Sequence, residues 1–168
     1  MINRPLPDEF APFQANYIKL VGNEPILEIL EKLKDDTYKF LTGIPADKAD
    51  YAYAEDKWTV KEVLGHMIDA ERTFAYRFLC FSREEIILPG FDQDVYMLKA
   101  TFKDRSLADL ANEFRAVREA NMYLYRSIKD EQQTQKGIAS GNPVSVRALL
   151  YIAAGHELHH VKILKERY

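Results

Sequence analysis

The chain has 168 residues, of which 47% are hydrophobic, enough for one domain that buries about 70% of its unfolded surface. With 23 basic and 26 acidic residues it lacks the basic excess of nucleic-acid-binding proteins, so we expect no nucleic-acid partner. Its single cysteine, Cys80, excludes an internal disulfide, and the apolar run at 148–154 is far shorter than the roughly 20 residues of a membrane span. With no apolar signal core at the N-terminus, we expect a cytoplasmic protein without membrane association.

Apolar residues at three- and four-residue steps predict the first two long helices. The first runs from Glu24 to about Leu41 and stops before a Gly-Ile-Pro sequence. The second begins after Thr59, which forms the pattern of a capping box with Glu62, and runs to about Phe81. Both helices are amphipathic, so each must bury one face against another element.

The connection after the second helix is irregular. A Pro-Gly pair at 89–90 breaks the helical pattern, and Asp92 can then cap a short helix that ends near Leu98. This stretch predicts a loop with a small helix.

Two further long helices follow. One is predicted from Ser106 to about Ile128, and the other from Ser145 to the C-terminus, after a turn at 140–143. Four amphipathic helices most simply form a four-helix bundle. We therefore predict an all-α fold, a single domain over residues 1–168, with an elaborated connection between the second and third long helices.

Three of the 4 histidines lie at 155–160 on the last predicted helix. His156 and His160 are four residues apart, so they lie about one turn apart on one face. That face continues an apolar stripe, whereas His159 lies toward its edge. Unpaired imidazoles in a core cost a few kcal/mol each, so these two side chains need hydrogen bonds or a metal ion.

His66 lies between Val63 and Ala70 on the inward side of the second helix. Taken alone, it is more simply a hydrogen-bonded core histidine. Together with His156 and His160, it favours a divalent metal site with one position open to water. These three histidines are the candidate metal ligands.

Acidic residues near the histidines are candidates for a supporting role. Asp69 follows His66 by three residues and Glu62 precedes it by four, while Glu157 directly follows His156. Each can accept a hydrogen bond from an imidazole, and Glu157 can also orient a water on the metal. A surface ion pair for Asp69, and solvent or another helix for Glu157, are the simpler interpretations.

His156 and Glu157, with His160, also match the His-Glu-x-x-His pattern of zinc metalloproteases. Only eight residues follow His160, too few for the downstream third ligand of such enzymes, and no substrate-binding sheet is indicated. A peptidase is therefore the least favoured hypothesis. Aromatic residues around the second helix and the connection can wall an apolar pocket, although core packing explains them equally well: Phe74, Tyr76, Phe78, Phe81, Phe91 and Tyr96.

Three stretches, at 58–69 (WTVKEVLGHMID), 89–96 (PGFDQDVY) and 155–160 (GHELHH), occur in the order found in one known family. On these motifs the chain resembles the DinB/YfiT-like family of bacterial four-helix bundles with a three-histidine metal site. The resemblance implies that His66, His156 and His160 hold zinc, nickel or another divalent ion in an open site.

Members of this superfamily with assigned activities include thiol transferases that use bacillithiol, mycothiol or glutathione, and a thiol-dependent isomerase. The resemblance implies a metal-dependent enzyme that activates a low-molecular-weight thiol, as a transferase does, or water, as a hydrolase does, against a small-molecule substrate. The alternative is a non-catalytic metal-binding or stress-related module whose histidines only stabilise the bundle. Relatives are commonly dimeric, so a homodimer is also expected.

Overall fold

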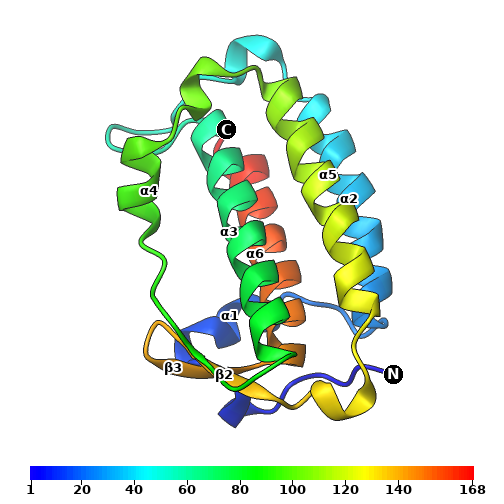
Figure 1. Ribbon diagram of the computed structural model, residues 1–168. Coiled ribbons are helices and arrows are strands. Elements are labelled where there is room, and N and C mark those ends of the chain that lie inside the picture. Colours follow the sequence, from blue (N-terminus) through cyan, green and yellow to red (C-terminus); the bar gives the residue numbers. More distant parts are fainter.

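The computed structural model describes residues 1–168, and four long helices form its main body (Figure 1). They are α2 (Ile26–Thr42), α3 (Val60–Phe81), α5 (Leu107–Arg126) and α6 (Val146–Arg167). Both α2 and α3 pack against α5 and α6, so the successive helices α2 and α3 lie across the bundle from each other. The predicted all-α bundle is confirmed. None of its helices combines the length and the apolar character that crossing a membrane requires.

The direction of the helices explains the long connection. In Figure 1, α2 and α6 run toward one end of the bundle, and α3 and α5 both run toward the other. Because α3 and α5 point the same way, the chain must return along the bundle between them. Residues 82–106 make this return through β1 (Ile87–Leu88), α4 (Gln93–Lys99) and a turn of 3-10 helix at Phe102–Asp104. The elaborated connection is therefore confirmed.

Side-chain caps fix where the helices begin. Thr59 Oγ1 accepts from the Glu62 amide at 3.3 Å, and Glu62 Oε2 accepts from the Thr59 amide at 2.8 Å, which is the predicted capping box. Ser106 and Ser145 cap α5 and α6 in the same position, and Asp92 caps α4. These starts are local features of the sequence, and all four were predicted correctly.

Some boundaries differ from the prediction. The first long helix begins at Ile26 rather than Glu24, because Pro25 occupies the N-cap position. The third ends at Arg126, two residues before the expected Ile128. Both shifts leave the buried faces of the helices unchanged.

A small three-stranded sheet, absent from the prediction, lies at one end of the bundle (Figure 1). Strand β2 (Lys136–Ala139) pairs parallel with β1 and antiparallel with β3 (Asn142–Ser145). Ser140 and Gly141 join β2 to β3 with φ angles of 53° and 75°, the two positive values of a type I′ hairpin turn. The predicted turn at 140–143 thus forms part of a hairpin.

The N-terminal segment lies against the same end of the bundle. Its short helix α1 (Ala15–Ile18) packs on α6, where the chains come so close that a Cβ on Gly155 would stand 2.1 Å from the carbonyl oxygen of Tyr17. Glycine at position 155 is what permits this contact.

Glu9 anchors the N-terminal segment to the start of α6. Its carboxylate is 3% exposed and accepts hydrogen bonds from Ser145 Oγ at 2.7 Å and from Arg147 Nε at 2.7 Å, with a second bond from Arg147 Nη2. Burial alone raises the pKa of Glu9, but the hydrogen bonds and charge of Arg147 outweigh it and leave the pKa below its ordinary value.

The core consists of two apolar clusters along the bundle. One includes Phe78 and Leu150, near the sheet, and the other includes Leu64 and Phe114. A buried polar layer of Glu71, Arg118 and Glu157 lies between these clusters along α3, α5 and α6.

Arg118 is the centre of that polar layer and is 0% exposed. Its Nε and Nη2 atoms each donate to a carboxylate oxygen of Glu71 at 2.8 Å. Its Nη1 lies 2.8 Å from Glu157 Oε2 in an ion pair whose angles fall outside those of a hydrogen bond. Nη1 also reaches the Leu30 carbonyl of α2 at 3.5 Å. One guanidinium therefore contacts all four long helices.

Replacing Arg118 with Met should strongly destabilise the protein, because it leaves the carboxyl groups of Glu71 and Glu157 buried without a cation. We expect the free energy of unfolding to fall by about 3–5 kcal/mol in urea denaturation. Arg115→Met, which removes an exposed arginine from the same helix, should cost less than about 1 kcal/mol. Equal losses from the two substitutions would show that the polar layer does not hold the helices together.

Acid should release the N-terminal segment. Because the pKa of Glu9 is lower in the folded than in the unfolded chain, its stabilisation is complete above about pH 4.3 and is lost as the pH falls through the folded value. We expect the hydrogen-exchange protection factors of the Lys19 and Leu20 amides to fall at low pH, and Glu9→Gln to reproduce that fall at pH 7. Asp8→Asn, at an exposed carboxylate, is the control. Full protection in Glu9→Gln would contradict the anchoring role.

Candidate metal centre

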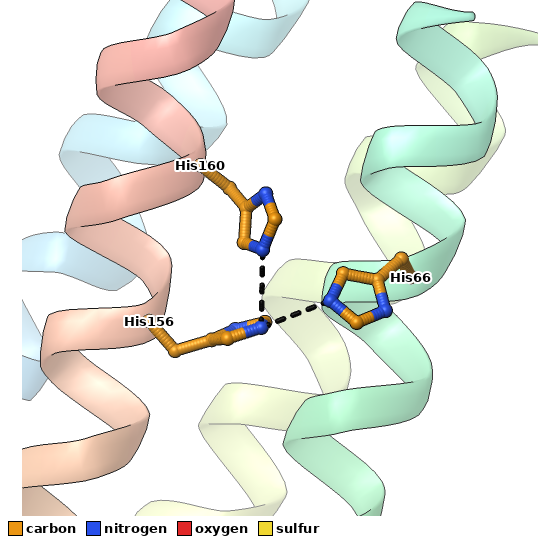
Figure 2. Close-up of side chains that lie close together, drawn as sticks. All are labelled: His66, His156 and His160. Atoms are coloured by element: carbon orange, nitrogen blue, oxygen red, sulfur yellow. Dashed lines mark hydrogen bonds between the residues drawn. The ribbon is translucent and has the colours of Figure 1, made fainter. Parts of the chain in front are cut away.

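Two helices bring three histidines together. His66 lies in the middle of α3, and His156 and His160 lie one turn apart on α6. Figure 2 shows the three rings pointing toward one another. His156 Nε2 is 2.9 Å from His66 Nε2 and 3.1 Å from His160 Nε2, and ring nitrogens of all three residues lie within 4.8 Å of one another.

Two of the three nitrogen–nitrogen spacings fit a shared metal ion. Two imidazole nitrogens bound to one ion at about 2.0–2.1 Å, with an angle of about 90–110° between them, lie about 2.9–3.4 Å apart. The two Nε2 contacts fall at the lower part of that range. A hydrogen bond explains one such pair, but a second close Nε2 contact to the same nitrogen is the pattern of ligands that converge on one ion.

Burial keeps the three rings neutral. His66 is 3% exposed and His156 is 7% exposed, whereas His160 is half-buried. Desolvation lowers the pKa of His66 to about 4, and desolvation together with the neighbouring His66 lowers the pKa of His160 to about 3. The pKa of His156 is also lowered, first by desolvation. Each ring thus offers a lone pair at neutral pH, as a metal ligand must.

Aromatic side chains surround the histidines. The ring centroids of Trp58 and Phe91 lie 5.0 and 6.2 Å from that of His66. Those of Tyr17 and Phe74 each lie 5.5 Å from the centroid of His156, in edge-to-face contacts. These walls come from four separate parts of the chain. They create the low-dielectric surroundings that strengthen electrostatic interactions in a site.

A pocket of about 150 Å³ opens beside His66 and His156. One face of α3 lines it, together with the N-terminal segment, the connection, the β2–β3 hairpin and α6. A second pocket, of about 270 Å³, reaches His160 beside Trp58. Gln93 at the start of α4 lines both pockets. The histidines therefore stand between two spaces that a small molecule can enter.

The acidic candidates do not reach the histidines. Glu157 points into the polar layer toward Arg118, and burial raises its pKa. Asp69 forms no hydrogen bond with His66, and Glu62 is used in the Thr59 cap. None of these three carboxylates hydrogen-bonds a histidine in the structure, and neither Glu157 nor Asp69 lines either pocket.

The aromatic candidates divide into two groups. Phe74 and Phe91 line the first pocket, whereas Phe78 and Phe81 are core residues. The remaining two lie elsewhere, with Tyr76 exposed on α3 and Tyr96 exposed on α4.

Tyr17 and Arg77 are among the pocket residues that the sequence analysis missed. Tyr17 lies on α1, a helix too short to show a period, and its contact with His156 depends on a distant part of the chain. Arg77 follows Ala70 and Phe74 on the stripe of α3 that begins at His66. A charged residue on that inward-facing stripe could have identified Arg77 as a candidate site residue from the sequence.

Comparison with known proteins places the fold. YfiT from Bacillus subtilis, described as "a probable metal-dependent hydrolase with an unusual four-helix bundle topology", has a similar structure with a TM-score of 0.72. The two chains are 17% identical, and the match covers 98% of this chain and 90% of that one. No curated protein matches this sequence.

A protein-family model also matches most of the chain. The model of the DinB superfamily matches residues 29–164, a span that includes all three clustered histidines and the four long helices except the ends of α2 and α6. The resemblance inferred from the sequence motifs is thereby confirmed, and the chain belongs to the DinB superfamily.

Proposed function

We propose that this protein is a metal-dependent enzyme that acts on a small molecule, with His66, His156 and His160 holding a divalent ion, zinc or nickel. The observation that carries the proposal is the convergence of three neutral imidazoles, of which His66 and His156 line one pocket and His160 lines another. A closed structural zinc site has four protein ligands, whereas three ligands leave a position for a reacting group. The similar structure of YfiT, described as that of a "probable" metal-dependent enzyme, supports this proposal.

Held by His66, His156 and His160, a divalent ion would lower the pKa of a bound water or thiol and so would supply a nucleophile at neutral pH. The protein's own residues position the imidazoles and shield them from solvent. The two helices fix the spacing of the imidazoles, and Trp58, Phe74 and Phe91 limit the access of bulk water. The Glu157 carboxylate lies in the polar layer, so the geometry does not support a peptidase with Glu157 as its base.

Water is the nucleophile that we favour. The pocket beside His66 and His156 has about the volume that holds a benzene-sized molecule, which leaves little room for a large co-substrate. YfiT is described as "a probable metal-dependent hydrolase". Hydrolysis of a small substrate needs no second organic molecule in the site.

Thiol transfer is the second candidate, and the second pocket supports it. That space is lined by His160 rather than by His66 and His156, and it is larger, at about 270 Å³. A low-molecular-weight thiol that occupied it would present its sulfur to the histidines while an electrophile occupied the first pocket.

Metal content tests the site directly. Elemental mass spectrometry of untagged protein purified without added metal should find about one divalent ion per chain in the wild type, and none in His156→Ala/His160→Ala. His159→Ala is the matched control, since His159 lies on the same helix outside the cluster, and it should keep the ion. If the wild-type protein takes up neither zinc nor nickel when offered one equivalent, the histidines form a hydrogen-bonded cluster and not a metal site.

Turnover separates the two nucleophiles. With the metal-loaded protein and a panel of small esters and amides, we expect hydrolysis that chelation abolishes and added metal restores. Products that form only when bacillithiol, mycothiol or glutathione is added would establish thiol transfer instead. Bound metal without turnover under either condition would favour a non-catalytic, stabilising role for the ion.

A further inference from the structure

Arg77 shares the first pocket with the histidines. It follows His66 by eleven residues, which at 100° per residue returns it to within about 20° of the same face of α3, roughly 16 Å farther along the axis. Side chains on a helix lean toward its N-terminus, so the long side chain of Arg77 leans toward His66. Both residues line the pocket, with Ala70 and Phe74 between them.

The guanidinium of Arg77 is buried without a counter-ion. The residue is 7% exposed and forms no ion pair with any carboxylate, unlike the buried Arg118 and the half-buried Arg147. Only Nη2 has partners, and both contacts are long: 3.4 Å to the Pro89 carbonyl and 3.3 Å to Ser140 Oγ. Nε and Nη1 form no hydrogen bond with the protein, and neither atom is fully buried, so both can be reached from the pocket. A largely buried guanidinium with no carboxylate partner and two accessible N–H groups indicates a site for an anion.

The rest of the pocket lining indicates which anion. The other lining residues are apolar, uncharged polar or neutral aromatic, so Arg77 is the one full charge in the pocket at neutral pH. One guanidinium balances one negative charge, and its planar fork matches the two oxygens of a carboxylate. A phosphate dianion carries up to two charges, and at the Arg77 end of the pocket, away from the proposed metal ion, no lysine or second arginine is present to meet the other one.

We propose that Arg77 binds the carboxylate of a small acidic substrate, holding it so that the reacting group lies at the three histidines. The pocket accommodates a body of about benzene size between the two ends, against Phe74 and Phe91. This inference rests on the proposed function and adds the class of substrate: a small organic acid with an apolar body.

Binding of a matched pair of probes to the metal-loaded protein tests the inference. Benzoate and benzamide have the same shape and differ in charge, and their affinities can be measured by NMR titration. We expect benzoate to bind at least about 10-fold more tightly, the factor that a charge-assisted hydrogen-bonded pair supplies. The amide signals of Ser140 and Asn142, which line the pocket beside Arg77, should shift.

Substitutions assign that preference to Arg77. Arg77→Met should abolish the preference for benzoate, and Arg77→Lys, which keeps the charge but not the fork, should retain only part of it. Arg72→Met is the matched control on the same helix, because Arg72 is half-exposed and pairs with Glu113, and it should leave the preference unchanged. Should Arg77→Met not fold, the partial loss in Arg77→Lys carries the same test.

Two results would overturn the inference. One is equal binding of benzoate and benzamide to the wild type. The other is an undiminished preference in the folded Arg77 variants, which would place the carboxylate elsewhere, for instance on the metal ion. Repeating the titration with His156→Ala/His160→Ala separates this inference from the proposed function, since the Arg77-dependent preference should persist without the ion. A negative result in the metal assay alone would therefore not contradict the anion site at Arg77.

Discussion

The buried guanidinium of Arg118 is the constraint on which the arrangement of the bundle depends. Apolar clusters on either side of it tolerate some sliding of one helix along another, whereas a buried charge with two buried carboxylates does not. Glu71 lies five residues after His66, and Glu157 is the immediate neighbour of His156. Any shift of α3 or α6 that separated the histidines would also remove a carboxylate from its cation. The polar layer therefore fixes the register that brings the imidazoles together.

The bundle and the segments added to it have different tasks. Helices α3 and α6 supply the three imidazoles, and their spacing follows from packing in the core. The N-terminal segment, the connection at 82–106 and the β2–β3 hairpin supply most of the remaining pocket walls. Because α3 and α5 are parallel, the connection has to run back along the bundle, and this path places Phe91 and Gln93 beside His66. The topology thus produces a pocket as well as a bundle.

Local signals made the helices and the histidine cluster predictable from sequence. The caps at Thr59, Ser106 and Ser145 depend on neighbours three residues away, and the spacing of His156 and His160 is set by the helix itself. The sheet was missed because its strands are short and β1 pairs with a strand about 50 residues later. The sequence did not decide whether Glu157 faces solvent or another helix, because its partner, Arg118, lies on a different helix. What escaped prediction depends on contacts between distant parts of the chain.

The close contact at Gly155 also has an evolutionary consequence. The N-terminal segment is attached to the bundle by this backbone contact and by the Glu9 ion pair, and hydrogen bonds of Arg4 hold the segment together. Its residues Phe13, Gln14 and Tyr17 face the pocket. These three side chains take no part in the two apolar clusters. Mutation of Phe13 or Tyr17 can therefore alter the pocket wall at little cost to folding stability, so that the shape of the pocket can diverge among descendants of one scaffold while the helices that carry the histidines stay the same.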